Sequence, residues 1–312
     1  MRKICFTSVC TADSYSYYIP LFVYTVKRAY PDAGVKIFVK GSLNETVKKA
    51  LELIPYDGWD VKENCFKEYP SKQSITNSLR FLSSSKNYNG YDYVFVRDID
   101  FLIFYHKTTH ERFFVKRMKK LPYFGVRGPY RKPRRAYVNR GGWKGSFTRV
   151  AGGTFVFKNP QWFDRTKKMI AHYRHNLKRN IPDNDDNNMP ASYREYDEVM
   201  LFRIIKGSGM PAPSKKGKSV YGYTVPKRYR DVHLGDFNKE KHGYRRLVKR
   251  VAVENLKNFV KMEKKDVTWR KIRFMMSGKN SKIRECLRRL RKHARRRLAS
   301  SCLSEEETAA KQ

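Results

Sequence analysis

The stretch from residue 91 to residue 104 reads YDYVFVRDIDFLIF, and it constrains the fold more than any other part of the chain. An aromatic and β-branched run leads to Asp98 and Asp100, and a second apolar run follows at residues 101 to 104. The first run predicts a buried strand. Because carboxylates cost free energy when they are buried without partners, the fold must supply partners for both aspartates.

Asp98 and Asp100 are spaced so that one divalent cation can contact both. Side chains at positions i and i+2 of an extended chain point to the same side. Carboxylate oxygens suit Mg²⁺ or Mn²⁺, and a cation held there can bind a diphosphate. A polar turn between two strands is the alternative, and for an isolated Asp-x-Asp it is the commoner explanation. The apolar run before Asp98 and the neighbouring elements favour the metal site.

Length and composition indicate a folded protein with an unusually basic surface. A chain of 312 residues can bury the core of one large domain, or of one domain with an appendage. Hydrophobic residues make up 40% of the chain and aromatic residues 14%, which argues against disorder. The net charge of +39 predicts attraction to polyanions such as nucleic acid, anionic lipid, or phosphorylated sugars and nucleotides.

The cysteines and the N-terminus bear on location. The five cysteines are an odd number and form no C-x-x-C pair, which favours a reducing compartment. The first apolar run is interrupted at Asp13, too early for a signal peptide, and no apolar run reaches 18 residues. The expected location is the cytoplasm, either free or peripheral on the inner face of a membrane.

Predicted strands alternate with predicted helices over the first 238 residues. This alternation predicts an α/β fold with a Rossmann-like, mainly parallel sheet flanked by helices. The Gly- and Arg-rich stretch at 127–149 has no periodicity, and its length is typical of a functional loop. Further strands are expected at 4–9, 35–39, 122–126 and 151–158, and helices at 19–30, 43–53, 75–86, 160–177 and 194–206. Residues 232–237, VHLGDF, form a short polar-tipped segment.

The composition changes at about residue 239. Basic helical patterns cover 245–260 and 279–298, so we expect a main domain at 1–238 and a basic helical extension at 239–312 whose last residues are disordered. The second helix either lies in an anionic membrane surface through an apolar stripe or packs that stripe on the main domain. The stripe consists of Ile283, Leu287, Leu290, Ala294 and Leu298.

Taken in order, these motifs resemble the GT-A class of nucleotide-sugar glycosyltransferases, and most closely the glycogenin-like, lipooligosaccharide galactosyltransferase type. That family opens with a strand and a nucleotide-binding turn, matched here by ICFTSVCTADSY at 4–15. An arginine precedes its metal strand, as Arg80 does here, and its Asp-x-Asp ends a hydrophobic strand, as at Asp98 and Asp100.

The later motifs of the family also have counterparts. A strand that starts with small residues is matched by residues 151–153, and an acidic pair on a helix is matched by Asp197 and Glu198. The family's His-x-x-Gly element is matched by VHLGDF, which contains His233. Here the glycine, Gly235, follows the histidine by two residues rather than three.

The resemblance implies a metal-dependent glycosyltransferase. Its donor is a nucleotide-sugar, with a UDP-sugar favoured, and its acceptor is a hydroxyl of a glycan or of a lipid-linked sugar. One member of the acidic pair orients the donor, acts as a base on the acceptor, or stabilises an oxocarbenium-like transition state. The implied residues are Asp98, Asp100 and His233 for Mn²⁺ or Mg²⁺, Thr7, Thr11, Arg80, Gly152 and Gly153 for the donor, and Asp197 and Glu198 for catalysis.

Two other classes of function compete with this one. The charge supports a nucleic-acid-binding protein, but the sequence contains no zinc finger or RNP motif. The charge is also spread out, because residues 239–312 hold 24 basic and 8 acidic residues, or +16 of the total of +39. A metal-dependent phosphohydrolase that uses Asp98 and Asp100 needs more clustered His and Asp residues than this chain has.

Overall fold

The structure is a computed structural model of the chain. The predicted loop at 127–149 lies outside the described residues except for its first residue. The segment PDNDDNN at 182–188, whose composition also predicts a loop, lies wholly outside them. The described residues are 3–70, 73–105, 110–118, 121–127, 150–179, 196–211, 231–238 and 251–309.

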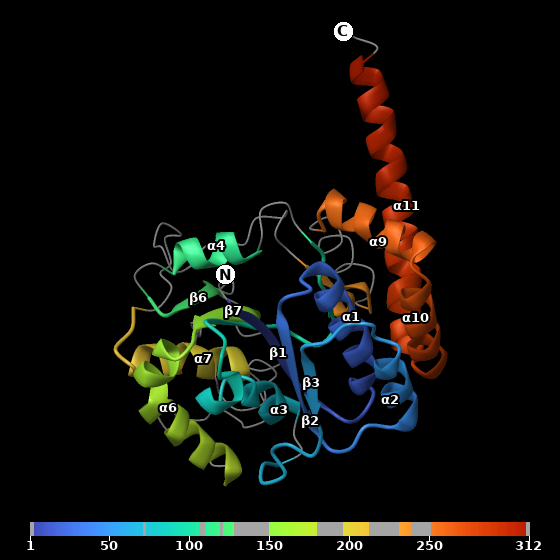
Figure 1. Cartoon of the computed structure of the whole chain (residues 1–312). Helices are drawn as coiled ribbons and strands as arrows, with labels where there is room; N and C mark the ends of the chain where they lie inside the picture. The colour runs from blue at the N-terminus through green and yellow to red at the C-terminus, as the bar shows by residue number, and fades with distance from the viewer. Residues whose placement is uncertain are drawn as a thin grey trace, which may run out of the picture.

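A six-stranded sheet in the order β3-β2-β1-β4-β7-β6 forms the centre of the molecule (Figure 1). Strand β1 pairs in parallel with β2 and β4, and β2 pairs in parallel with β3. Strand β7 is antiparallel to β4 and β6, so the prediction of a mainly parallel sheet is confirmed. The strands are β1 Ile4–Thr11, β2 Gly34–Lys40, β3 Trp59–Lys62, β4 Tyr93–Val96, β6 Tyr123–Arg127 and β7 Val150–Lys158.

Helices cover both faces of this sheet because successive strand residues point to opposite faces, and both faces are apolar. Phe6 and Phe95 pack with α1, α2 and α4 in one core cluster. Cys5 and Val94, their neighbours along the strands, pack with α3, α6 and α7 in the other. These helices are α1 Ile19–Ala29, α2 Glu45–Glu52, α3 Gln73–Leu79, α4 His110–Arg117, α6 Gln161–Lys178 and α7 Tyr196–Gly207.

Helix α1 is apolar on nearly all sides, which is typical of a helix that is buried all round. Its outer side is covered by the C-terminal helices α9 (Val253–Lys265), α10 (Val267–Lys279) and α11 (Ser281–Ala309), which stand beside α1 in Figure 1. At this contact Asp266 accepts hydrogen bonds from Tyr24 Oη at 2.6 Å and Arg28 Nε at 3.0 Å. The sequence pattern predicted helices near α9 and α11 but did not predict α10.

The apolar stripe of α11 packs on the protein. Ile283, Leu287, Leu290 and Ala294 are all 0% exposed and belong to the core cluster that contains α1. Insertion of this stripe into a membrane is therefore excluded, and the alternative of packing on the main domain is what the structure has. Among the helices that the structure describes, none is both long and apolar enough to cross a bilayer.

Helix α11 is longer than predicted. It continues beyond residue 298 to Ala309 and projects away from the rest of the molecule (Figure 1). The helix covers residues that were expected to be disordered, as far as Ala309, and disorder of the last residues stays a prediction. The segment SEEETA contains strong helix formers and neither Gly nor Pro, so nothing in it ends the helix.

A second, two-stranded sheet lies beyond the end of β4. Strand β5 (Phe101–Leu102) pairs antiparallel with β8 (Val232–His233), and Phe101 lies opposite His233. A 3-10 turn, η4 (Leu234–Asn238), follows β8, and two further turns are η1 (Ser16–Tyr18) and η2 (Ser85–Tyr88). This small sheet brings the VHLGDF segment to the Asp-x-Asp segment.

Candidate metal centre

The Asp-x-Asp motif lies at the carboxyl edge of the main sheet, where β4 ends. The strand stops at Val96, and Ile99 and Asp100 form a turn. The chain from Asp98 to Asp100 is therefore not extended, whereas the i, i+2 spacing predicted an extended chain with both carboxylates on the same side of it. The turn instead buries Ile99, which is 5% exposed, in the core cluster and leaves Asp98 and Asp100 close together.

Asp98, Asp100 and His233 converge as the resemblance implies. Each offers one ligand atom, and these atoms all lie within 4.8 Å of one another. His233 Nε2 is 3.0 Å from Asp100 Oδ1, and the imidazole stacks on Phe101 with ring centroids 4.7 Å apart. The backbone N–H of Leu234 donates to the carbonyl of Asp100 at 2.8 Å, which fixes the two segments together.

Asp236 holds His233 from its other side. Its Oδ1 lies 3.2 Å from His233 Nδ1, so the carboxylate can accept the Nδ1 proton and leave Nε2 directed at the site. Burial by itself lowers the pKa of His233, but Asp100 and Asp236 outweigh burial and raise that pKa well above its usual value. The sequence analysis missed Asp236, although it stands three residues after the histidine in VHLGDF.

Two glycines give the carboxylates room. A Cβ on Gly153 would lie 2.4 Å from Asp98 Oδ2, and a Cβ on Gly235 would lie 2.6 Å from Asp100 Oδ2. The resemblance implied a donor contact for Gly153, and the structure adds that this glycine makes the position of Asp98 possible. Gly152 precedes it in β7.

Arg80 connects the metal-ligand candidates to the acidic pair. It directly follows α3, is 7% exposed, and forms ion pairs with Asp98 and with Asp197 in the first turn of α7. Burial lowers the pKa of Arg80, but the two carboxylates outweigh it and raise the pKa. Burial also raises the pKa of Asp197 despite the guanidinium, whereas in Asp98 the guanidinium prevails and lowers the pKa. The arginine predicted as a donor contact is thus also a bridge.

The acidic pair is divided between two environments. Asp197 is 5% exposed and is held by Arg80, whereas Glu198 is half-buried on the next position of α7. The structure therefore joins Asp197 directly to the group around Asp98. The two residues remain candidates for different roles.

The two threonines are separated by the structure. Thr7 lies in the middle of β1, is 1% exposed, and donates to the carbonyl of Lys36 at 2.9 Å. Its hydroxyl faces the core, while its carbonyl accepts the backbone N–H of Arg97 at 3.0 Å, one residue before Asp98. The expected donor contact of Thr7 stays a prediction. Thr11 ends β1 at the carboxyl edge, and its buried hydroxyl has no hydrogen-bond partner among the described residues.

The C-terminal helices also reach this edge of the sheet. Asn280 is 6% exposed, and its Nδ2 donates to the carbonyl of Ser14 at 2.8 Å, next to Tyr15. Tyr15 is 39% exposed, and its pKa is raised by burial and then by Asp100 and other carboxylates. Arg289 Nη1 donates to the carbonyl of Phe237 in η4 at 3.1 Å. Sequence patterns gave no signal for these contacts.

A buried ion pair holds the segment that leads to His233. Arg97 is 1% exposed, and its Nε lies 3.3 Å from Asp231 Oδ2, two residues before His233. The guanidinium also lies 5.4 Å from the ring centroid of Phe95. Because a buried charge without a partner is costly, this pair ties the segment before β8 to the end of β4.

The three candidate ligands fit a divalent metal. Two carboxylates and one imidazole within 4.8 Å of one another can be spanned by metal–ligand bonds of about 2.0–2.2 Å. The nitrogen donor favours Mn²⁺ over Mg²⁺, since Mg²⁺ prefers oxygen ligands. Three protein ligands leave positions for the oxygens of a diphosphate.

Comparisons with known proteins give structural likenesses only. No protein-family model matches the sequence, and no curated protein matches it either. Solved structures that the chain resembles include several glycosyltransferases.

Three of these structures illustrate the likeness. The galactosyltransferase LgtC, solved with donor and acceptor sugar analogs, is 16% identical over 64% of this chain and 70% of its own, with a TM-score of 0.39. The glycosyltransferase GlyE of Streptococcus pneumoniae is 12% identical over 73% of this chain and 46% of its own, with a TM-score of 0.39. Core-mannan synthase A of Aspergillus fumigatus, in an Mn/GDP form, is 10% identical over 66% and 70%, with a TM-score of 0.39. TM-scores this low describe distant overlays, so the chemistry of the site follows from its own residues.

Proposed function

We propose that this protein is a metal-dependent glycosyltransferase that moves a sugar from a nucleotide-sugar to a hydroxyl of a glycan or lipid-linked acceptor. The observation that carries the proposal is the convergence of Asp98, Asp100 and His233 at the carboxyl edge of a parallel sheet. Ligands bind at this edge in open α/β sheets. The order of motifs along the chain supports the same class.

In this proposal three residues are metal ligands, and two further residues hold these ligands in place. Asp98, Asp100 and His233 would hold Mn²⁺, which would neutralise the charge that develops on the leaving diphosphate. Asp236 keeps Nε2 of the imidazole directed at the site. Arg80 keeps the carboxylate of Asp98 ionised and in place.

The reaction also needs groups around the sugar. The anomeric C–O bond to the diphosphate breaks, a C–O bond to the acceptor forms, and the acceptor hydroxyl loses its proton to a base. We assign the groups around the sugar to Asp197 or Glu198, beside Gly152 and Gly153. The buried hydroxyl of Thr11 and the exposed ring of Tyr15 belong to the donor side, because Thr11 ends β1 and Tyr15 lies in the turn that follows it.

A binding screen tests the proposal directly. Nucleotide-sugars, UDP-sugars first, should raise the melting temperature of the full chain with Mn²⁺ present and not in its absence. Asp100→Asn should abolish this stabilisation and leave the melting temperature of the unliganded protein nearly unchanged, because one ligand charge is lost with little change in shape. Asp164→Asn, at an exposed carboxylate on α6, is the matched control and should behave like the wild type. Wild-type Mn²⁺-dependent stabilisation in Asp100→Asn would refute the metal centre.

A further inference from the structure

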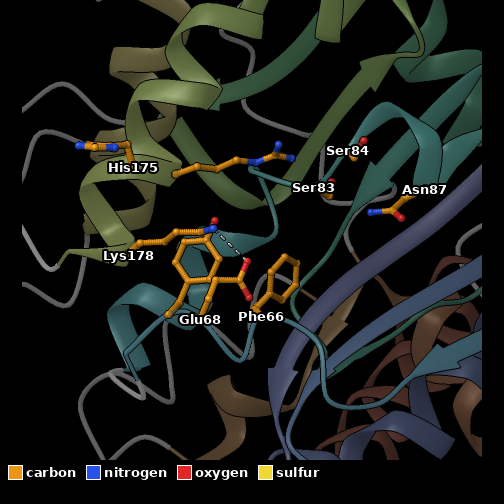
Figure 2. Close-up of a pocket in the computed structure, with 9 residues that line it drawn as sticks. Phe66, Glu68, Ser83, Ser84, Asn87, His175 and Lys178 are labelled. Atoms are coloured by element: carbon orange, nitrogen blue, oxygen red, sulfur yellow. Dashed lines mark ion pairs between the residues drawn. The ribbon is translucent and has the colours of Figure 1, made fainter.

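A polar pocket of about 440 Å³ lies between α6 and the two segments that flank α3 (Figure 2). One wall comes from the loop at 66–69, one from residues 83–87, and one from the last turns of α6. None of the metal-ligand candidates lines it. Its volume lies within the range of pockets that hold small molecules.

The loop at 66–69 begins from a strained backbone. Asn64 and Phe66 have φ angles of +57° and +58°, in the left-handed region that residues with a side chain rarely adopt. The backbone N–H groups of Asn64 and Cys65 donate at 2.9 Å to carbonyls at and just after the end of β2, which holds the strained turn in place. This conformation places Phe66 in the lining of the pocket.

The facing wall carries short hydrogen-bonding side chains. Ser83, Ser84 and Asn87 stand on the side opposite Glu68 and Lys178 in Figure 2. The segment that bears them is held by Arg174, whose Nε donates to the carbonyl of Leu82 at 2.7 Å. Hydroxyl and amide groups therefore face the pocket from a fixed backbone.

Positive charge predominates around the pocket. Two cations, Arg174 and Lys178, line it together with one carboxylate, Glu68, and the imidazole of His175. Lys178 Nζ lies 3.6 Å from Glu68 Oε1, but the two side chains are 48% and 50% exposed, so the pair is weak. A ligand anion can therefore take the place of Glu68 beside Lys178 at little cost.

We propose that this pocket binds a small anionic saccharide, a sugar that carries a phosphate or a carboxylate group. Sugar hydroxyls pair with Ser84 and Asn87, and the apolar face of the sugar ring packs on Phe66. The anion binds Lys178 and Arg174 through charge-assisted hydrogen bonds. The inference stands apart from the proposed transfer reaction, because it uses no residue of the metal centre.

Calorimetric titration of the full chain, without added metal, tests this site. The probes are glucose 6-phosphate, glucuronate, glucose and inorganic phosphate. The two anionic sugars should bind at least about tenfold more tightly than glucose or phosphate, because only they use both walls. Lys178→Glu should remove this preference, while Lys168→Glu, at an exposed lysine of α6 outside the pocket, should not.

The substitution Glu68→Gln should increase the affinity for anionic sugars, which a purely structural role of Glu68 would not produce. It removes the carboxylate that competes for Lys178, so the anionic sugars should bind a few-fold more tightly. Equal affinities for phosphate and glucose 6-phosphate would overturn the saccharide assignment, and so would tighter binding of a nucleoside monophosphate than of either sugar. Absence of binding, or affinities that Lys178→Glu does not change, would overturn the site as a whole. None of these results bears on the Mn²⁺-dependent stabilisation by nucleotide-sugars.

Discussion

At the scale of single residues, the metal centre depends on the absence of side chains as much as on their presence. The Asp98 carboxylate occupies the space that a side chain at position 153 would need, and Asp100 does the same beside Gly235. Real Cβ atoms do not approach other heavy atoms at 2.4 or 2.6 Å, so a substitution must displace either the carboxylate or the strand. Strand β7 is paired with β6 before and after Gly153, at Ala151 and at Val156, so we expect the carboxylate to be the part that moves.

Gly153→Ala should weaken Mn²⁺ binding about 10- to 100-fold, the effect expected when the support of a ligand is disturbed. Titration calorimetry with Mn²⁺ measures this loss, and circular dichroism checks the fold. The control is Gly278→Ala in α10, where an added Cβ meets nothing within 4 Å. That substitution should leave Mn²⁺ affinity unchanged and raise the free energy of unfolding by about 0.5–1 kcal/mol. Unchanged Mn²⁺ affinity in Gly153→Ala would contradict the packing argument.

Arg80 should be energetically coupled to Asp197. Arg80→Gln removes the cation between two carboxylates and should lower the free energy of unfolding by about 3–5 kcal/mol, since it leaves buried charge uncompensated. In an Asp197→Asn background the same change should cost less, because one of the stranded charges is gone. Denaturant unfolding of the four proteins gives the coupling energy, and additive effects would show that the bridge does not matter for stability.

At the scale of elements, α11 frames the candidate site although it lies far from it in sequence. Asn280 serves two purposes: its Oδ1 accepts the N–H of Ile283 at 3.1 Å at the start of the helix, and its Nδ2 holds the carbonyl of Ser14. The same helix holds η4 through Arg289. The start of α11 thus sets both the turn after β1 and the segment after His233.

Substitutions at Asn280 can separate these two contributions. Asn280→Asp keeps an oxygen for the helix cap but loses the donor to Ser14, so it should weaken nucleotide binding with little loss of stability. Asn280→Ala removes both and should also cost about 1 kcal/mol of stability, as expected for a lost cap. Titration with UDP and Mn²⁺, together with thermal unfolding, measures both effects. If Asn280→Asp binds UDP like the wild type, the contact to Ser14 does not position the donor turn.

At the scale of the whole molecule, part of the net charge of +39 lies on the exposed side of α11. Its apolar stripe is buried, and its exposed side is rich in basic residues. We propose that this side holds the protein on an anionic membrane surface through charge alone. Each basic residue near an anionic leaflet contributes about 1 kcal/mol. The residues of this basic face are Arg288, Arg291, Lys292, Arg295 and Arg296, which line one shallow groove of about 440 Å³.

Charge reversal at Lys292, Arg295 and Arg296 should abolish co-sedimentation with anionic vesicles while the fold is kept, because all three are exposed. Binding of the wild type should fall steeply with salt and be absent for neutral vesicles. Deletion of residues 279–312 is an unsuitable substitute, since it removes buried core residues and should leave an unstable protein. If the wild type does not prefer anionic vesicles at physiological salt, the proposal fails, and a nucleic-acid gel shift becomes the next test.

The sequence by itself determined the α/β alternation and the position of the acidic motif, because strand and helix periodicities are local properties of a chain. It also pointed to Arg80, His233 and the acidic pair, through their order along the chain. Only the tertiary structure decided how these groups meet. The convergence of Asp98 and Asp100 depends on a turn, and the distance to His233 depends on the pairing of β5 with β8.

The same distinction explains what was missed. Asp236, Asp231 and Asn280 act through partners that are near in space, whatever their separation in sequence, and no periodicity reports such contacts. The stripe of α11 was recognised as apolar, but a membrane and a protein core attract apolar surface by the same effect. Only the folded chain, with the core cluster that contains α1 on the other side of that stripe, decided between them.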